Sequence, residues 1–399
     1  MSKTSASKSV LISGGAGFIG SALSNRLVQA GYDVAVMDVL HPQVHARGRS
    51  IDLPASVRLF TGDVTHAPDW DAVLRLFEPS QVVHLAAETG TAQSLSEATR
   101  HGSVNVVGTT QLLDALSRSA LVPDQLVLAS SRAVYGEGAW QSGAEVFYPR
   151  PRSHAQLLAG EWDPQGPAGA SATPLSSCAD RTEPRPTNIY AGTKLAQEHL
   201  LASWAAAHDT NLSVLRLQNV YGPGQSLTNS YTGIVTLFAR LARTKQALEV
   251  YEDGRIVRDF VFIDDVVDAL FAAVHTPATE RRTLDIGSGT ATTIHELAHK
   301  VADICAAPEP VVVGKFRDGT CARRVAISRP QSRASGGARS GHWKTAYMRC
   351  SNGSTKTARI VFEQAATSAS IDKRGHPVIA VNPELRQCFS NLTQKCRKA

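Results

Sequence analysis

The glycine-rich stretch Gly14–Gly20 constrains the fold of this chain more than any other feature. It follows a short apolar run at 10–13, typical of a buried parallel strand, and leads into a helical pattern of apolar residues at 21–29. The first glycine permits a tight turn, Gly17 lets the backbone approach a pyrophosphate, and Gly20 allows helix and strand to pack closely. Free N–H groups at the helix start, together with the helix dipole, favour phosphate charge. The stretch therefore predicts a dinucleotide-binding strand–turn–helix unit.

An acidic residue at the end of the next predicted strand supports the same interpretation. This strand covers 33–38 and ends in Asp38, 18 residues after Gly20. Asp38 can accept hydrogen bonds from both hydroxyls of a ribose and would repel a 2′-phosphate, and no Lys or Arg occupies 39–41. We therefore expect NAD rather than NADP as the cofactor. The alternative is a structural glycine turn beside an ordinary surface Asp.

Strand and helix patterns go on alternating beyond this unit, with a helical stretch at 105–116. Four further runs are typical of buried strands: 58–60, 81–87, 125–131 and 212–217. Such alternation predicts an α/β fold with a Rossmann-type doubly wound parallel sheet. Ligands bind at the carboxyl ends of strands in these sheets. Four residues occupy such strand ends here: Asp63, Ala86, Ala87 and Ser131.

A tyrosine and a lysine four residues apart, Tyr190 and Lys194, indicate the chemistry. On a helix this spacing places both side chains on one face. A free tyrosine has a pKa near ~10 and is a poor base at neutral pH, but a nearby ammonium stabilises the phenolate and lowers that pKa. Ser131 would bind the reacting hydroxyl, and Tyr190 would take its proton as hydride leaves for a nicotinamide. Such a pair is common on helices, so the prediction depends on the glycine loop and the serine that precede it.

Composition excludes several other classes of protein. The chain has 399 residues, enough for more than one domain, and no run of 18 apolar residues. The polar start 1–9 lacks the apolar core of a signal peptide, and six cysteines without CxxC spacing predict neither a zinc site nor a disulfide framework. We expect a soluble, cytoplasmic protein with reduced cysteines. We also expect no metal site, no membrane contact and no nucleic-acid partner.

The net charge of +6 originates in the last part of the chain. Residues 316–399 hold 16 Lys and Arg against 4 Asp and Glu, which leaves the rest of the chain at −6. The segment is rich in Arg, Ser and Ala, holds four of the six cysteines and shows no convincing period. We interpret 320–399 as an atypical basic tail, poorly ordered or non-homologous, for example read out of frame. A basic appendage with its own partner is the alternative.

A series of motifs, in order over residues 9–315, resembles the nucleotide-sugar epimerase/dehydratase family of extended short-chain dehydrogenases/reductases. The motifs are Gly14–Gly20, His84–Ala87, Asn105–Thr109, Ser130–Gly136, Tyr190–Lys194, Asn219–Gly224 and Arg258–Val261. The resemblance implies NAD as cofactor, a nucleotide-diphosphate sugar as substrate, a smaller C-terminal substrate-binding domain and a possible homodimer.

The same resemblance implies a role for individual residues. The catalytic residues would be Ser131, Tyr190 and Lys194. Cofactor contacts would come from Gly14, Gly17, Phe18, Ile19, Gly20, Asp38, Asp63, Val64, Leu85, Ala86, Ala87, Asn105, Tyr190 and Lys194. Substrate contacts would come from Glu88, Thr89, Ser131, Asn219 and Arg258. An Arg fork such as that of Arg258 suits a diphosphate.

Two positions next to the strand-end serine narrow the reaction. Family 4,6-dehydratases carry Asp-Glu there, where this chain has Arg132 and Ala133. Neither residue can serve as the acid–base pair, so we expect an epimerase, which needs only Ser, Tyr, Lys and retained NAD. Segments 84–94 and 217–227 look similar to a bacterial subgroup that includes dTDP-L-rhamnose 4-epimerases, which produce dTDP-6-deoxy-L-talose for surface polysaccharide. UDP-glucose 4-epimerase is the nearest alternative, and an NAD-binding sensor without turnover is the non-enzymatic one.

The expected organisation has three regions. An NAD-binding Rossmann domain covers 1–210, a mainly substrate-binding region covers 211–319, and the tail covers 320–399. Within the first region, 137–186 is a Pro/Gly/Ser-rich insert that lengthens the spacing between the serine and the tyrosine to 59 positions. We expect this insert to be a lid or an oligomer contact at the active-site mouth, or else a mobile loop.

Overall fold

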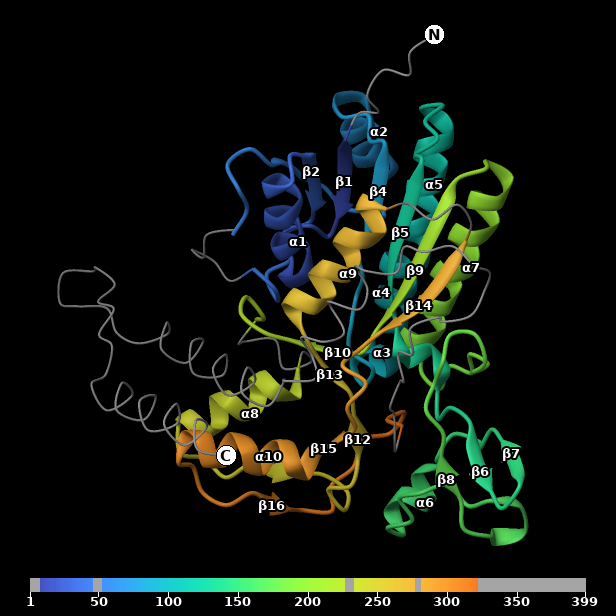
Figure 1. Cartoon of the computed structure of the whole chain (residues 1–399), viewed down its shortest axis with the longest axis vertical. Helices are drawn as coiled ribbons and strands as arrows, with labels where there is room; N and C mark the ends of the chain where they lie inside the picture. The colour runs from blue at the N-terminus through green and yellow to red at the C-terminus, as the bar shows by residue number, and fades with distance from the viewer. Residues whose placement is uncertain (1–7, 46–51, 227–232, 277–280, 322–399) are drawn as a thin grey trace, which may run out of the picture.

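A computed structural model of the chain describes residues 8–45, 52–226, 233–276 and 281–321 (Figure 1). The atypical tail predicted from residue 320 lies outside the described residues from position 322 on. The described chain forms a sheet layer with helices on both faces and, at one end of it, two smaller groups of elements.

Seven parallel strands form the central sheet, in the order β14-β9-β5-β4-β1-β2-β3. They are β1 (Ser9–Ser13), β2 (Asp33–Asp38), β3 (Arg58–Thr61), β4 (Gln81–His84), β5 (Gln125–Ser131), β9 (Asn211–Leu217) and β14 (Arg282–Ile286). The strand order reverses direction between β1 and β4, which opens a crevice at the carboxyl ends of those strands. The doubly wound α/β fold predicted from the alternating pattern is therefore confirmed.

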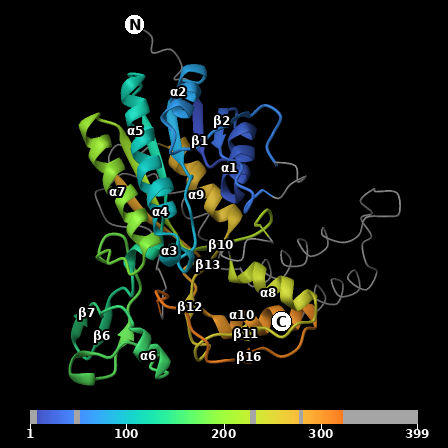
Figure 2. The same cartoon turned by 180° about the vertical axis from the view of Figure 1, so that it is seen from behind.

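Helices cover both faces of this sheet because its strands are apolar on both sides. Val10 and Ile12 belong to one core cluster and Leu11 to the other, as the period of two in a strand requires. Helices α1 (Phe18–Gln29) and α9 (Ile263–His275) pack on the first face (Figure 1). The second face carries α2 (Ala67–Leu76), α5 (Gly108–Arg118) and α7 (Ile189–Ala207), seen from behind in Figure 2. Short helices α3 (Gln93–Ser96) and α4 (Ala98–His101) and a π-helical turn (Gly102–Val107) lead into α5.

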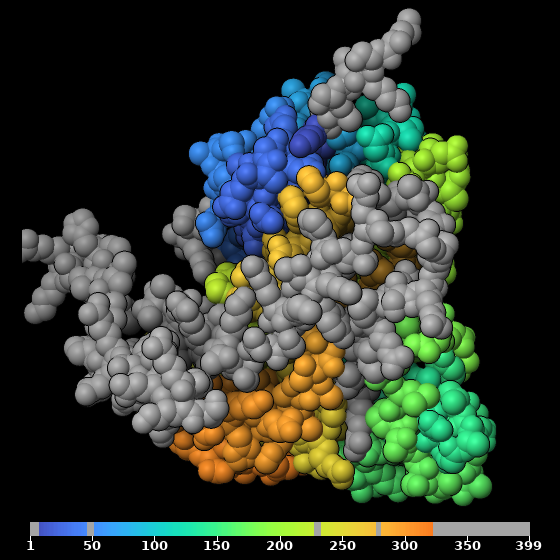
Figure 3. Space-filling model, in the orientation of Figure 1, coloured from blue at the N-terminus to red at the C-terminus, as the bar shows by residue number. Residues whose placement is uncertain are grey.

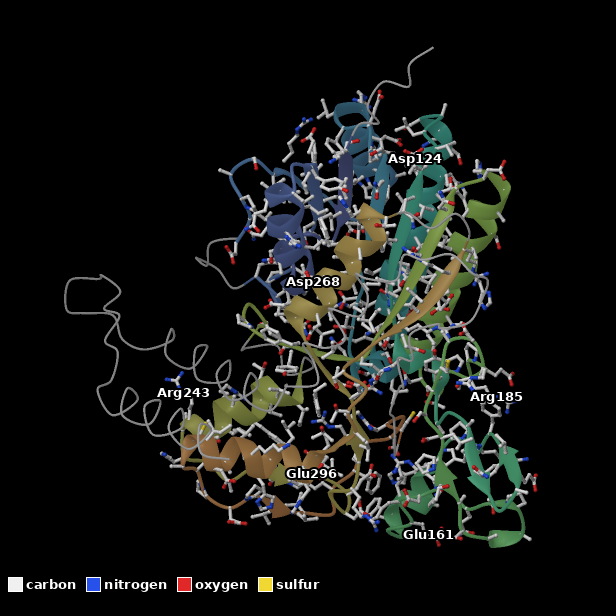
Figure 4. All side chains as sticks on the ribbon, in the orientation of Figure 1. Asp124, Glu161, Arg185, Arg243, Asp268 and Glu296 are labelled. Carbon is white, nitrogen blue, oxygen red and sulfur yellow. The ribbon has the colours of Figure 1, made fainter. Side chains whose placement is uncertain are left out.

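A small region follows the sheet and is built from short paired strands and two helices. The pairs are β10 (Asn219–Tyr221) with β13 (Phe260–Phe262), β12 (Val257–Arg258) with β15 (Thr292–Thr293), and β11 (Glu249–Val250) with β16 (Val311–Val312). The helices are α8 (Ile234–Arg243) and α10 (Ile294–Cys305), marked near Arg243 and Glu296 in Figure 4. The sequence assigned 211–319 mainly to a substrate-binding region. The structure places β9, α9 and β14 of that range in the sheet layer, so the chain leaves the sheet and returns to it.

The insert 137–186 forms a compact group beside the small region, at the same end of the molecule (Figure 3). Its strands β6 (Trp140–Ser142), β7 (Glu145–Phe147) and β8 (Thr173–Pro174) make an antiparallel sheet, accompanied by α6 (His154–Leu158) and a 3-10 turn (Pro167–Gly169). The Trp140 side chain is fully buried. Arg152 of the insert donates to the carboxylate of Glu252 in the small region at 2.8 and 3.1 Å. The insert is thus docked against the small region through a buried ion pair.

Candidate active site

The glycine loop adopts the geometry that a closely bound phosphate requires. Gly14 has φ +68°, and a Cβ there would lie 2.7 Å from the Ala86 backbone. A Cβ at Gly20 would lie 2.4 Å from the Cα of Gly15, so helix and turn touch there. Gly17 is the N-cap of α1, whose first N–H groups face the crevice. Side chains at these positions would displace the loop, which is why the sequence carries glycine.

Asp38 is fixed at the end of β2 by two main-chain donors. Its Oδ2 accepts from the N–H of Ala16 at 3.0 Å, and its Oδ1 accepts from the N–H of Leu40 at 2.9 Å. Asp63 is held in a similar way, because its Oδ1 accepts from the N–H and the hydroxyl of Thr65, both at 2.8 Å. Both carboxylates are thereby oriented at the carboxyl edge of the sheet before any ligand arrives.

A cavity of about 730 Å³ lies at this edge. Its wall includes eleven of the predicted cofactor residues: Gly14, Gly17, Phe18, Ile19, Gly20, Asp38, Asp63, Val64, Leu85, Ala86 and Ala87. The predicted substrate residues Glu88, Thr89 and Asn219 line it as well. The volume suits a nucleotide-sized ligand. Exposed N–H groups at one end and an oriented carboxylate at the other fit the pyrophosphate and the adenosine ribose of NAD.

The predicted catalytic side chains meet at the junction of β5 and α7. Ser131 ends β5, and α7 starts at residue 189, where the side chain of Asn188 accepts from the N–H of Ala191 at 2.9 Å. The Ser131 hydroxyl hydrogen-bonds Tyr190 in the first turn of α7. Burial raises the pKa of Tyr190, and this hydrogen bond and the positive charge of Arg132 both act to lower it. Burial has the largest effect, so the pKa of the Tyr190 phenol lies above its ordinary value.

Lys194 lies one turn further along α7 and is almost fully buried. Burial lowers its pKa to about 7, against the attraction of the Glu198 carboxylate four residues on. Glu198 in turn forms a two-point ion pair with Arg216 of β9, at 3.0 and 2.7 Å. The sequence reasoning missed Glu198, although the same four-residue spacing that pointed to Lys194 leads to it.

Asn105 occupies a different place from the one expected of a cofactor contact. Its side chain is fully buried within the π-helical turn, behind the wall of the cavity. The amide accepts from the N–H of Glu88 at 2.8 Å and donates to the Glu88 carbonyl at 3.1 Å and the Thr193 hydroxyl at 2.9 Å. Asn105 thus ties the cavity wall to the helix that carries Lys194. The Glu88 carboxylate is itself paired with Arg100 at 2.7 Å.

A second cavity, of about 510 Å³, lies in the small region and shares Asn219 with the first. Arg258 lines it, and its guanidinium donates to the carbonyls of Val257 at 2.8 Å and Cys321 at 2.9 Å. Tyr251 and Arg317 lie on the same wall, with the guanidinium 5.3 Å from the ring centre. Asn219 and Arg258 are thereby brought to one ligand-sized space, while their contacts with a substrate remain a prediction.

Comparison with known proteins identifies the family. A model of the NAD dependent epimerase/dehydratase family matches residues 10–162 and 165–287, more than half of the chain. The chain belongs to this family. Its motifs were therefore interpreted correctly as those of an NAD-dependent epimerase or dehydratase, and the expected type of enzyme is confirmed.

Several proteins similar to this chain are enzymes whose substrates are known. A dTDP-L-rhamnose 4-epimerase from Burkholderia thailandensis is 55% identical over 314 residues, which cover 78% of this chain and 85% of the relative. The UDP-glucose 4-epimerase of Thermotoga maritima, solved with UDP-glucose, is 26% identical with a TM-score of 0.64, over 80% of this chain and 89% of that one. The Thermus thermophilus UDP-glucose 4-epimerase, solved with NAD, is 27% identical with a TM-score of 0.61, over 86% and 99%.

Among the helices that the structure describes, none has the length and apolar character needed to span a bilayer. Within residues 8–45, 52–226, 233–276 and 281–321, no group of three or more His, Cys, Asp or Glu side chains could hold a metal ion.

Proposed function

We propose that the protein is an NAD-dependent nucleotide-sugar 4-epimerase that converts dTDP-L-rhamnose to dTDP-6-deoxy-L-talose. The choice of sugar nucleotide is supported by the 55% identical relative from Burkholderia thailandensis, which is named for that activity. The chemistry is supported by one observation above all, the hydrogen bond between Ser131 and Tyr190 with Lys194 one turn away. This arrangement puts a proton acceptor and an orienting hydroxyl side by side.

Binding of NAD would rest on the residues around the larger cavity. The N–H groups that begin α1, at Phe18 and Ile19, would receive the pyrophosphate, and Asp38 would accept from the adenosine ribose. The fixed carboxylate of Asp38 disfavours a 2′-phosphate, so NAD is the expected form. When bound, NAD supplies a nicotinamide that accepts a hydride from the sugar and returns it.

The protein side chains would move and hold the proton. Ser131 donates to or accepts from the 4-hydroxyl and keeps it beside the Tyr190 oxygen. Tyr190 takes the hydroxyl proton as the carbon is oxidised and gives it back to the 4-keto oxygen when the carbon is reduced. In its protonated form Lys194, one turn along α7, would favour the ionised form of Tyr190. Because epimerisation needs reduction from the opposite face, the sugar ring must turn while the rest of the substrate stays bound.

Asn219 and Arg258 suit the task of holding the substrate during that turn. Both line the second cavity, and Asn219 also lines the first, so Asn219 belongs to the border between the two cavities. Amide and guanidinium N–H groups are donors that suit a diphosphate. We assign them to that group of the substrate.

Proton NMR of the purified protein tests this function. The protein is mixed with dTDP-L-rhamnose or, separately, with UDP-glucose, and no cofactor is added. A C4-inverted product from dTDP-L-rhamnose alone supports the proposal, and the Tyr190→Phe variant should lose at least roughly a hundredfold in rate. If only UDP-glucose is converted, the substrate is UDP-glucose and not dTDP-L-rhamnose. Bound NAD with no turnover and no effect of Tyr190→Phe would favour a sensor.

UDP-glucose 4-epimerase is the second candidate, for a specific reason. A relative of that name from Mycolicibacterium smegmatis is 28% identical over 330 residues, and the solved structures of that activity share the fold. The homodimer, the cytoplasmic location and the division at residue 210 stay predictions. Light scattering of the purified protein checks the first of them.

A further inference from the structure

Arg132 contacts Asn219, a residue that lines both cavities, and has no part in the reaction as described so far. It follows Ser131 directly, in a short 3-10 turn (Arg132–Tyr135). Its Nε donates to the Oδ1 of Asn219 at 2.7 Å. A guanidinium carries donors only, so the atom that it meets must be the amide oxygen and not the amide nitrogen. The Nδ2 of Asn219 is consequently a donor on a residue that lines both cavities.

Asp259 and Asn219 are fixed in one unit around this guanidinium. The N–H of Asn219 donates to the Asp259 carbonyl at 3.0 Å in the pairing of β10 with β13. The fully buried Asp259 carboxylate accepts from the N–H and hydroxyl of Ser288 at 2.8 and 2.7 Å and from the N–H of Gly289 at 2.9 Å. Burial raises the pKa of Asp259, and the charge of Arg132 acts against that rise together with these hydrogen bonds. The buried acid is thus an electrostatic partner for the arginine.

Arg132 is also close to the acid–base site. The positive charge of Arg132 acts to lower the pKa of Tyr190. Ser131, the neighbour of Arg132 in the chain, hydrogen-bonds the phenol. The Arg132 side chain therefore contacts the Asn219 amide and also interacts electrostatically with Tyr190, the group that moves the proton. A merely structural arginine would need neither relation.

We propose that Arg132 is a positioning residue that orients the Asn219 amide toward the diphosphate of the substrate and stabilises the Tyr190 phenolate through its charge. The inference rests on the proposed function. It makes substrate binding and proton removal depend on one residue, and it gives a role to the position where dehydratases of the family carry an acid.

Three substitutions separate the hydrogen bond from the charge. Arg132→Met removes both, Arg132→Gln keeps a donor for Asn219 but loses the charge, and Arg132→Lys keeps a charge and a donor. Arg118→Met serves as the matched control, because Arg118 forms an exposed pair with Asp71 far from the site. Binding of dTDP and UDP is measured by calorimetry, and the pH dependence of kcat by NMR. The ionisation of Tyr190 is followed by ultraviolet difference spectroscopy against the Tyr190→Phe variant.

The expected pattern differs between the three variants. Nucleoside diphosphate binding should weaken about tenfold in Arg132→Met and stay within roughly threefold in Arg132→Gln and Arg132→Lys. The apparent pKa of Tyr190, seen in the pH profile and the absorbance, should rise by roughly one pH unit in the Met and Gln variants and stay unchanged in the Lys variant. Arg132→Met should thus change both nucleotide binding and the titration of Tyr190, Arg132→Gln only the titration, and Arg132→Lys neither.

Several results would overturn the proposal. Unchanged binding and an unchanged Tyr190 titration in Arg132→Met would remove both parts of it. Equal losses in all three variants, together with a lower unfolding temperature, would show a structural role only. The absorbance and calorimetry measurements need no turnover. If the wild-type protein binds a nucleoside diphosphate but does not convert dTDP-L-rhamnose, the proposed function is contradicted. The comparison of the Arg132 variants still tests the role of Arg132 in that case. Failure of the wild-type protein to bind either nucleotide would contradict the assignment of Asn219.

Discussion

Replacement of Glu252 by Gln should detach the insert from the small region and destabilise the protein. The guanidinium of Arg152 and the carboxylate of Glu252 bind at two points, and both side chains are at most 2% exposed. The substitution keeps the size of the side chain and removes its charge. Arg152 is then left as a buried cation, held by the Glu137 carboxylate at 3.7 Å and by two main-chain carbonyls.

The magnitude follows from the cost of a buried charge without its partner. Removing one member of a buried pair costs about 3–5 kcal/mol of unfolding free energy. Glu137 remains near Arg152 and compensates part of the loss, so we expect the lower end, about 3 kcal/mol. That value corresponds to a roughly hundredfold decrease in the ratio of folded to unfolded protein. The Arg152→Met/Glu252→Gln double variant should lose less than the sum of its single variants, because it leaves no unpaired guanidinium.

Urea unfolding of the single and double variants measures these values, and limited proteolysis reports on the insert. Glu183→Gln is the control, because Glu183 forms an exposed pair with Arg185 at 2.9 Å in the same insert. Arg185 is labelled near the edge of the molecule in Figure 4. Such a pair contributes about 0–1 kcal/mol. If Glu252→Gln costs no more than Glu183→Gln, the ion pair does not hold the insert and the reasoning is refuted.

Three further predictions concern the site. Burial lowers the pKa of Lys194 from 10.5 to about 7, so the unfolded chain binds more protons between these values. The unfolding free energy of cofactor-free protein should therefore rise by roughly 3 kcal/mol from about pH 7 to 9.5, and urea titrations of Lys194→Met should lack this rise. Gly136→Ala would put a Cβ 1.9 Å from the Arg185 carbonyl at φ +60°, whereas a Cβ at Gly143, with φ +57°, meets nothing within 4 Å. We expect Gly136→Ala to lose at least about 2 kcal/mol more than Gly143→Ala in thermal unfolding; equal losses would contradict this. Asp38→Asn should weaken NAD binding about tenfold and reduce the ratio of the affinity for NAD to the affinity for NADP. Calorimetry with both nucleotides measures these affinities.

Local patterns allowed most of the sheet to be predicted. Buried apolar runs such as 125–131 and 33–38 coincide with β5 and β2, because strands covered on both faces are apolar throughout. The glycine loop was recognisable for a related reason, since its close backbone approach to Ala86 admits no side chain. Features that depend only on residues close together in the sequence could thus be predicted from it.

Contacts between distant segments were not accessible in this way. Arg152 and Glu252 are 100 positions apart, and Arg132 and Asn219 are 87 apart. Neither pair has a fixed spacing, because each depends on how the insert or the small region returns to the sheet. The place of Asn105 behind the cavity wall was likewise unpredictable, since a π-helical turn shifts the face that a side chain occupies.

The anchoring of the last described residues has a consequence for how such a chain can evolve. Arg152 donates to the carbonyl of Thr320 at 2.7 Å, and Arg258 donates to that of Cys321 at 2.9 Å. A main-chain oxygen is the same in every residue type, so these two arginines recognise the path of the chain and are indifferent to its side chains. Thr320 lines the smaller cavity, so substitutions at 320 can alter the border of that cavity without loss of the anchor. Cys321 is constrained by its side chain as well, because this is buried and its Sγ hydrogen-bonds the Thr187 hydroxyl at 3.3 Å. One position can thus vary while its neighbour and the two arginines keep the attachment constant.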